Sequence, residues 1–91
     1  MNWIEIIHLR MNSISDFESI NNQLRQIIKA VQTEISQKVK IYRRPAIDGD
    51  LCIMLYWNSE NTVCLSSDLG VTLTASLKEF GRVDHAVWVE L

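Results

Sequence analysis

Two residues near the start of the chain, His8 and Arg10, carry side chains suited to acid–base chemistry and to binding an anion. They are two positions apart, so in an extended strand both side chains point to the same face. A histidine titrates near neutral pH and can act as a general base, while an adjacent arginine can hold a carboxylate or phenolate. We therefore take His8 and Arg10 as the candidate catalytic pair. The alternative is structural, with His8 satisfied by a neighbouring group and Arg10 solvated.

Aromatic residues in two later segments suggest a pocket for a flat organic molecule. Tyr56 and Trp57 are consecutive, and Trp88 follows His85 by three positions near the end of the chain. Pockets for small ligands are lined mainly by apolar and aromatic groups. We predict Tyr56, Trp57, Trp88 and His85 as ligand-binding residues, and His85 would approach His8 if their strands are neighbours. The alternative is that the aromatic residues fill a core or an interface, and that His85 has a surface role.

Other polar clusters are less specific. The basic run Lys38, Lys40, Arg43 and Arg44 could bind an acidic group, but a solvated edge strand is the simpler interpretation. Asp48-Gly49-Asp50 is typical of a tight turn, and two carboxylates alone do not make a calcium site. Cys52 and Cys64 form neither a C-x-x-C nor a zinc pattern. We predict no metal and no cofactor from these residues, and two reduced thiols.

Hydrophobic periodicity defines the elements that must position these residues. Alternating or continuous apolar runs predict four strands, and apolar residues at steps of three and four predict two helices. Ser15 and Glu18 suggest a capping box at the first helix, and Gly81 suggests a C-cap for the second. The strands are expected at residues 3–11, 38–44, 51–57 and 84–91, and the helices at 17–35 and 67–80.

The order strand, helix, strand, strand, helix, strand predicts an α+β fold of the ferredoxin-like β-α-β-β-α-β type. Residues 1–91 are enough for a single domain of this kind. Right-handed crossovers place the first and third strands at the centre of a four-stranded antiparallel sheet, with both helices on one face.

The two central strands have no polar side. Ile4 and Ile6 alternate with Ile7 and Leu9 on the first strand, and the third strand is apolar throughout. A single two-layer domain would leave such a face in water, which soluble monomers avoid. We therefore expect a homodimer that pairs through the sheet faces.

Composition narrows the partners and the location. The formal net charge is −2, so the chain lacks the basic excess typical of nucleic-acid binding. No apolar stretch reaches the length of a membrane span, and the N-terminal segment is not a signal peptide. We expect no nucleic-acid or membrane partner, and a cytoplasmic protein.

Near the end of the third strand the sequence Leu55-Tyr56-Trp57-Asn58-Ser59-Glu60 resembles a strand-Trp-x-Ser/Asp-x pattern, and the segment from Ala75 to Val83 followed by Trp88 is similar to a closing segment. Both are features of small antibiotic-biosynthesis-monooxygenase-like proteins in the dimeric α+β barrel superfamily. The resemblance implies a dimeric barrel with a small cavity in each subunit. Haem-degrading members use an Asn, a Trp and a His on the second helix; Trp57 matches the Trp, but residues 67–80 contain no histidine. The resemblance therefore argues against haem chemistry here.

Two functions remain open from the sequence. One is a monooxygenase-like enzyme, or a binder of a small aromatic or organic ligand. The alternative is a non-enzymatic dimeric interaction or structural module. Fold resemblance alone does not choose between them.

Overall fold

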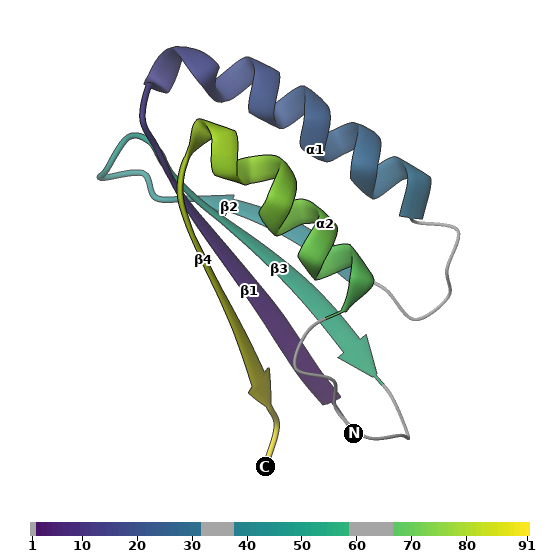
Figure 1. Ribbon diagram of the computed structural model, residues 1–91. Helices are drawn as coiled ribbons and strands as arrows, with labels where there is room; N and C mark the ends of the chain where they lie inside the picture. The colour runs from purple at the N-terminus through teal and green to yellow at the C-terminus, as the bar shows by residue number, and fades with distance from the viewer. Residues whose placement is uncertain (1, 32–37, 59–66) are drawn as a thin grey trace.

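A computed structural model describes residues 2–31, 38–58 and 67–91 and shows one sheet covered by two helices (Figure 1). The element order is the expected β-α-β-β-α-β. The elements are β1 (Asn2–Met11), α1 (Phe17–Val31), β2 (Lys38–Arg43), β3 (Asp50–Asn58), α2 (Asp68–Leu77) and β4 (Gly81–Val89), with short 3-10 turns at Ile14–Asp16 and Lys78–Phe80. Cys64 and Ile35 lie outside the described residues.

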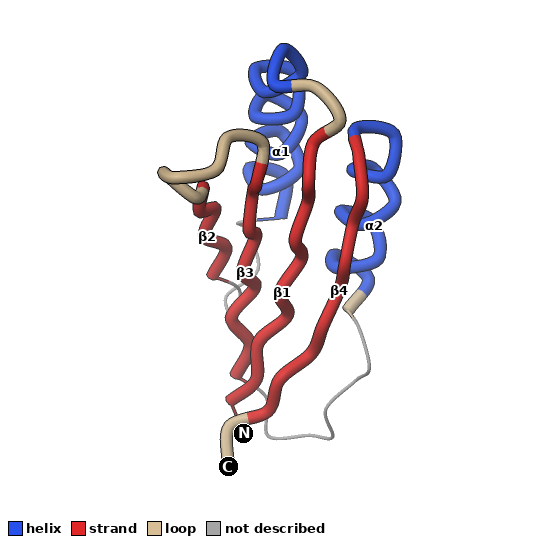
Figure 2. Tube along the Cα trace, turned by 90° about the vertical axis from the view of Figure 1, so that its left-hand side faces the viewer, coloured by secondary structure: helices blue, strands red, loops and turns tan. Residues whose placement is uncertain are grey.

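The sheet is antiparallel, with strand order β2-β3-β1-β4. β1 and β3 are therefore the central strands, which confirms the predicted ferredoxin-like topology. Both helices lie on one side of the sheet, and the other side carries no element of the described chain (Figure 2). We call that uncovered side the open face.

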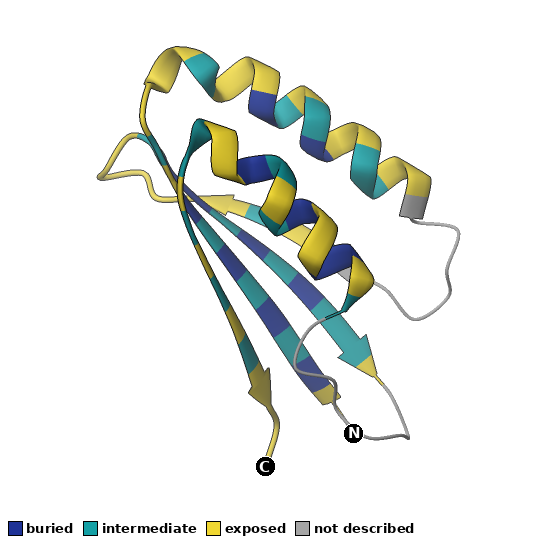
Figure 3. Cartoon of the chain, viewed as in Figure 1, coloured by how far each residue is buried: buried dark blue, intermediate teal, exposed yellow. Residues whose placement is uncertain are grey.

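The core lies between the sheet and the helices. Alternate residues of β1 are buried and the residues between them are only half-buried, which is the period of two expected for a strand with one covered face (Figure 3). Alternate residues of β3 and one side of each helix complete the core. Its fully buried apolar side chains are Ile7, Leu9, Ile20, Leu24, Ile53, Leu55, Leu73 and Leu77.

Two expected helix caps are wrong. A 3-10 turn precedes α1, and Ser15 lies inside it with its hydroxyl 2.7 Å from that of Ser13, so no capping box forms with Glu18. Gly81 is extended rather than left-handed and begins β4. It is glycine for a different reason, since a Cβ there would overlap the carbonyl oxygen of Arg10 on the adjacent strand.

The Asp48-Gly49 turn between β2 and β3 has the predicted conformation, with Gly49 at a φ of 92°. In the part of the chain that the structure describes, no helix is long and apolar enough to cross a membrane.

Candidate functional site

The most unusual residue of the core is a carboxylate, Glu5, which is completely buried on the helix-facing side of β1. Its Oε1 accepts hydrogen bonds from Trp57 Nε1 at 2.9 Å and from the Ser67 backbone N–H at 3.1 Å. Its Oε2 lies 2.7 Å from His85 Nε2. One side chain thus connects β1 to β3, to β4 and to the start of α2. We call Glu5, Trp57, His85 and Ser67 the Glu5 cluster.

The strand register explains why these side chains meet. Glu5 pairs with Leu55 on β3 and with Val87 on β4, so Trp57 and His85 are its diagonal neighbours on the same face. The register alone therefore brings a carboxylate, an indole and an imidazole together.

The start of α2 closes the cluster from above. Ser67 is the N-cap of α2 and its hydroxyl accepts from the Gly70 backbone N–H at 2.9 Å. The N-terminus of a helix carries a partial positive charge that favours an adjacent carboxylate. Gly70 is required by space, because a Cβ there would overlap Glu5 Oε2 and lie 3.2 Å from His85 Cε1.

The cluster can hold an imidazole in one orientation. A carboxylate that accepts at Oε2 fixes the proton of His85 on Nε2, which leaves Nδ1 with a lone pair when the ring is neutral. The His85 side chain is 18% exposed, whereas that of Glu5 is not exposed at all. The arrangement is that of a buried carboxylate supporting a partly accessible base.

An aromatic hollow lies at the end of the sheet next to this cluster. Trp57 stacks on Trp3 with ring centroids 5.4 Å apart and an interplanar angle of 19°. The hollow has a volume of about 910 Å³, and Trp57 is the residue that it shares with the Glu5 cluster. Its lining consists of Asn2, Trp3, Ile4, Lys40, Tyr56, Trp57, Asn58, Trp88, Val89 and Glu90.

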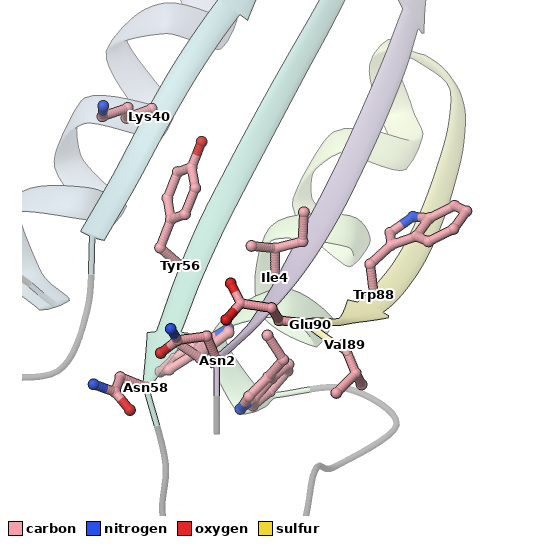
Figure 4. Close-up of a pocket in the computed structure, with 10 residues that line it drawn as sticks. Asn2, Ile4, Lys40, Tyr56, Asn58, Trp88, Val89 and Glu90 are labelled. Atoms are coloured by element: carbon pink, nitrogen blue, oxygen red, sulfur yellow. The ribbon is translucent and has the colours of Figure 1, made fainter.

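Several lining residues project from the open face (Figure 4). Tyr56, Ile4 and Trp88 stand on β3, β1 and β4 in front of the sheet, with the helices behind it. Lys40 Nζ lies 5.8 Å from the centroid of the Tyr56 ring, a distance that permits a cation–π contact. Trp88 is 62% exposed, which is unusual for so large an apolar side chain.

His8 and Arg10 belong to a separate group on the open face, further along β1. Arg10 Nε lies 3.0 Å from Asp50 Oδ1, while His8 Nε2 and Arg44 NH1 each lie 3.6 Å from Asp50 Oδ2. The hydrogen bond from Arg10 lowers the pKa of Asp50 and raises that of Arg10. The Asp50 side chain is only 3% exposed, so it is enclosed by cations.

The structure divides the six residues singled out from the sequence into three places. Tyr56, Trp57 and Trp88 line the hollow together. His85 joins Glu5 on the helix-facing side, and its strand partner there is Ile7. His8 pairs with Asp84 and so lies on the opposite face from His85, and the two histidines do not face each other.

Glu5 was not identified from the sequence. The available signal was a single acidic residue on a strand parity that is otherwise apolar, between Trp3 and Ile7. Such a residue is almost never buried without hydrogen-bonding partners. Among the described residues, no group of three or more His, Cys, Asp and Glu side chains is arranged to hold a metal ion.

Comparison with known proteins gives matches in structure and none in sequence. No family model matches the chain, and no curated protein matches it in sequence. A conserved protein from Methanosarcina mazei Go1 superposes with a TM-score of 0.78 at 11% identity, covering 100% of this chain and 94% of the other. Rv0793 from Mycobacterium tuberculosis gives a TM-score of 0.71 at 15% identity, with 100% and 96% covered.

Two further matches have informative descriptions. A structure described as an antibiotic biosynthesis monooxygenase gives a TM-score of 0.70 at 8% identity, covering 100% of this chain and 99% of that one. SnoaB, a cofactor-independent oxygenase from Streptomyces nogalater, gives 0.64 at 11% identity, with 98% and 92% covered. The chain therefore has the fold of antibiotic-biosynthesis-monooxygenase-like proteins, as its sequence resemblance implied, and identities this low establish the fold alone.

Proposed function

We propose that the protein is a homodimeric, cofactor-independent oxidoreductase of the monooxygenase-like kind that acts on a flat aromatic compound. The observation that carries this proposal is the hydrogen bonding of Glu5 to both His85 and Trp57, the latter being part of the aromatic hollow. A buried carboxylate is costly in a small core, and here it supports an imidazole beside an aromatic wall.

A hydroquinone illustrates the chemistry that these residues support. The aromatic ring of the substrate stacks against Trp57, which brings a phenolic hydroxyl to His85. His85 accepts the phenolic proton and Glu5 stabilises the imidazolium that results. The phenolate is a far better electron donor than the phenol. Overall the hydroquinone loses two protons and two electrons, O₂ accepts both pairs and becomes H₂O₂, and the product is the quinone.

The test is oxygen uptake with a panel of one-ring, two-ring and three-ring hydroquinones. We expect turnover above the uncatalysed rate for at least one of them, and a fall of about 100-fold or more in His85→Gln, as for other general bases. His8→Gln is the matched control, because His8 lies on the open face and contacts Asp50 instead. Loss of turnover in His8→Gln but not in His85→Gln would move the proposed base to the His8 and Arg10 pair.

We also propose that a second copy covers the open face. Ile4, Ile6 and Met54 are half-buried there in the single chain, and Trp88 is largely exposed. A stable interface buries about 800 Å² per partner, an area that one face of a four-stranded sheet can supply. Such pairing would also cover the side of the hollow formed by Tyr56 and Trp88.

The dimer is tested by light scattering coupled to size-exclusion chromatography. The single chain is 10.5 kDa, and we expect twice that mass at micromolar concentration. Trp88→Asp should shift the protein towards the monomer, while Val71→Asp should not, since Val71 is similarly exposed but lies on α2. A wild-type monomer at all concentrations tested would refute the proposed pairing.

A cytoplasmic location is part of the same proposal. Cys52 has no disulfide partner among the described residues, and reduced thiols are usual in that compartment.

A non-enzymatic dimeric module is the second candidate function, and one observation favours it. Every hydrogen bond of the Glu5 cluster joins two different secondary-structure elements, so the cluster also serves to hold α2 on the sheet. A stable dimer that neither oxidises any hydroquinone of the panel nor shows tryptophan quenching by them would support this candidate over the first.

A further inference from the structure

A second groove, between α1 and the outer edge of β2, combines apolar side chains with positive charge. Its volume is about 730 Å³. The apolar part of the lining is Phe17, Ile28, Val39, Ile41 and Leu51, and the polar part is Asn21, Arg25, Lys29, Tyr42 and Arg43. We call this the α1/β2 groove. Its lining holds three cations and no carboxylate, in a protein whose net charge is −2.

The cations of this region are a large share of the total. Arg25, Lys29, Lys40 and Arg43 are four of the nine Lys and Arg residues, and all four side chains are exposed. Among the described residues, none of the four makes an ion pair with a carboxylate, unlike Arg10, which is bound to Asp50. The groove and the adjoining strand therefore attract anions.

β2 is also an edge strand with one side open. It pairs with β3, and no other described strand lies beside it (Figure 2). Its six residues, Lys38–Arg43, thus present unpaired backbone N–H and C=O groups along the border of the groove. Such an edge can accept an extended peptide as an additional strand, with main-chain hydrogen bonds for affinity and side-chain pockets for specificity.

We propose that the α1/β2 groove binds an acidic segment of another protein as a fifth strand alongside β2. In an added strand, alternate side chains face the helix side, where Val39, Ile41 and Ile28 provide apolar contacts. The intervening side chains face Lys40 on the open face, and residues at the strand ends face Arg25 and Arg43. A peptide of alternating apolar and acidic residues matches both sets.

An alternative explanation of the cations is that they prevent edge pairing, as lysines on edge strands often do. Lys40 alone would suffice for that. It does not account for Arg25 and Lys29 on α1, which border a groove whose floor is formed by half-buried Ile28, Val39 and Ile41. The groove opens on the helix side of the sheet, so it is independent of the proposed dimer and of the proposed oxidation.

The probe is a fluorescein-labelled peptide of seven alternating Glu and Val residues, titrated with the wild-type protein and followed by fluorescence anisotropy. We expect saturable binding that weakens as salt is added. The same peptide with N-methyl groups along its backbone keeps its charges but cannot donate main-chain hydrogen bonds, so its binding should be lost. Hydrogen exchange measured with and without the peptide should show new protection at residues 38–43.

Two matched charge reversals locate the site. Lys29→Glu places a negative charge in the groove and should weaken binding about five-fold, the effect of one exposed ion pair. Lys78→Glu makes the same change in the 3-10 turn after α2, away from the groove, and should leave affinity almost unchanged.

Four results would overturn the proposal. They are the absence of binding at millimolar peptide, equal binding of the N-methylated peptide, and equal weakening by the two lysine reversals. The fourth is full protection of the β2 amides in the free protein, which would mean that another copy already occupies the edge. Binding of a fatty-acid anion in place of the peptide would instead identify the groove as a site for small amphiphiles.

Discussion

Replacing Glu5 with glutamine tests whether the buried carboxylate stabilises the fold through its charge. The substitution keeps the shape of the side chain and one acceptor oxygen. The carbonyl can still accept from Trp57 Nε1 and the Ser67 N–H. The new amide group, however, meets His85 Nε2 at the position where an oxygen accepted. His85 must then move its proton to Nδ1 so that Nε2 becomes an acceptor.

The size of the effect follows from the hydrogen bonds. Three bonds change from charge-assisted to neutral, and each loses about 1 kcal/mol of its net contribution. Relief of the cost of burying a charge offsets part of that loss. We therefore expect Glu5→Gln to reduce the free energy of unfolding by about 2 kcal/mol, out of about 5–15 kcal/mol for a domain. In a chain this short the melting temperature should fall by about 8–16 °C.

Urea denaturation at a fixed protein concentration, followed by tryptophan fluorescence, measures this change. Glu79→Gln is the matched control, since Glu79 is exposed in the turn after α2 and should have little effect. Imidazole ¹⁵N chemical shifts report the expected change of the His85 tautomer. Equal stability of Glu5→Gln, Glu79→Gln and wild type, or a gain in stability, would show that the charge of Glu5 contributes nothing to the fold.

Three further changes test other parts of the structure. Gly70→Ala should destabilise the protein by about 2–4 kcal/mol, because the added methyl group overlaps the buried glutamate and displaces α2 from the sheet; chemical denaturation measures this, and unchanged stability would contradict the packing. The pKa of Asp50 is lowered by Arg10, so the stability from this pair is present above the ordinary pKa of an aspartate and lost as the pH falls through the lowered value. Asp50→Asn should therefore be less stable than wild type at pH 7 and approach it at pH 2–3, and a difference that is constant with pH would refute the ion pairing. Burial raises the pKa of Cys52, so in a Cys64→Ser background a thiol reagent at pH 8 should label it more slowly than a free thiol, and more slowly still where the proposed dimer forms; labelling at the free-thiol rate would exclude both effects.

The sequence determined the architecture because architecture depends on patterns that are local or global in period. Alternating residues in β1 and the Ile20 and Leu24 stripe of α1 specify which side of each element is apolar. Chirality then leaves a single arrangement with β1 and β3 at the centre. Helix ends were less predictable. Gly81 has the residue type of a C-cap, but its role is close contact with the Arg10 backbone, which is a tertiary contact.

The candidate site depended on tertiary structure to a greater extent. Tyr56, Trp57 and Trp88 could be proposed as a group from residue type, and the structure places them around one hollow. By contrast, the partners of each histidine were decided by strand register. A shift of one residue between β1 and β4 would exchange the faces of His85 and Asp84, and Glu5 would then have no imidazole beside it. That register is a pairing of residues about eighty positions apart, which no pattern within either strand specifies.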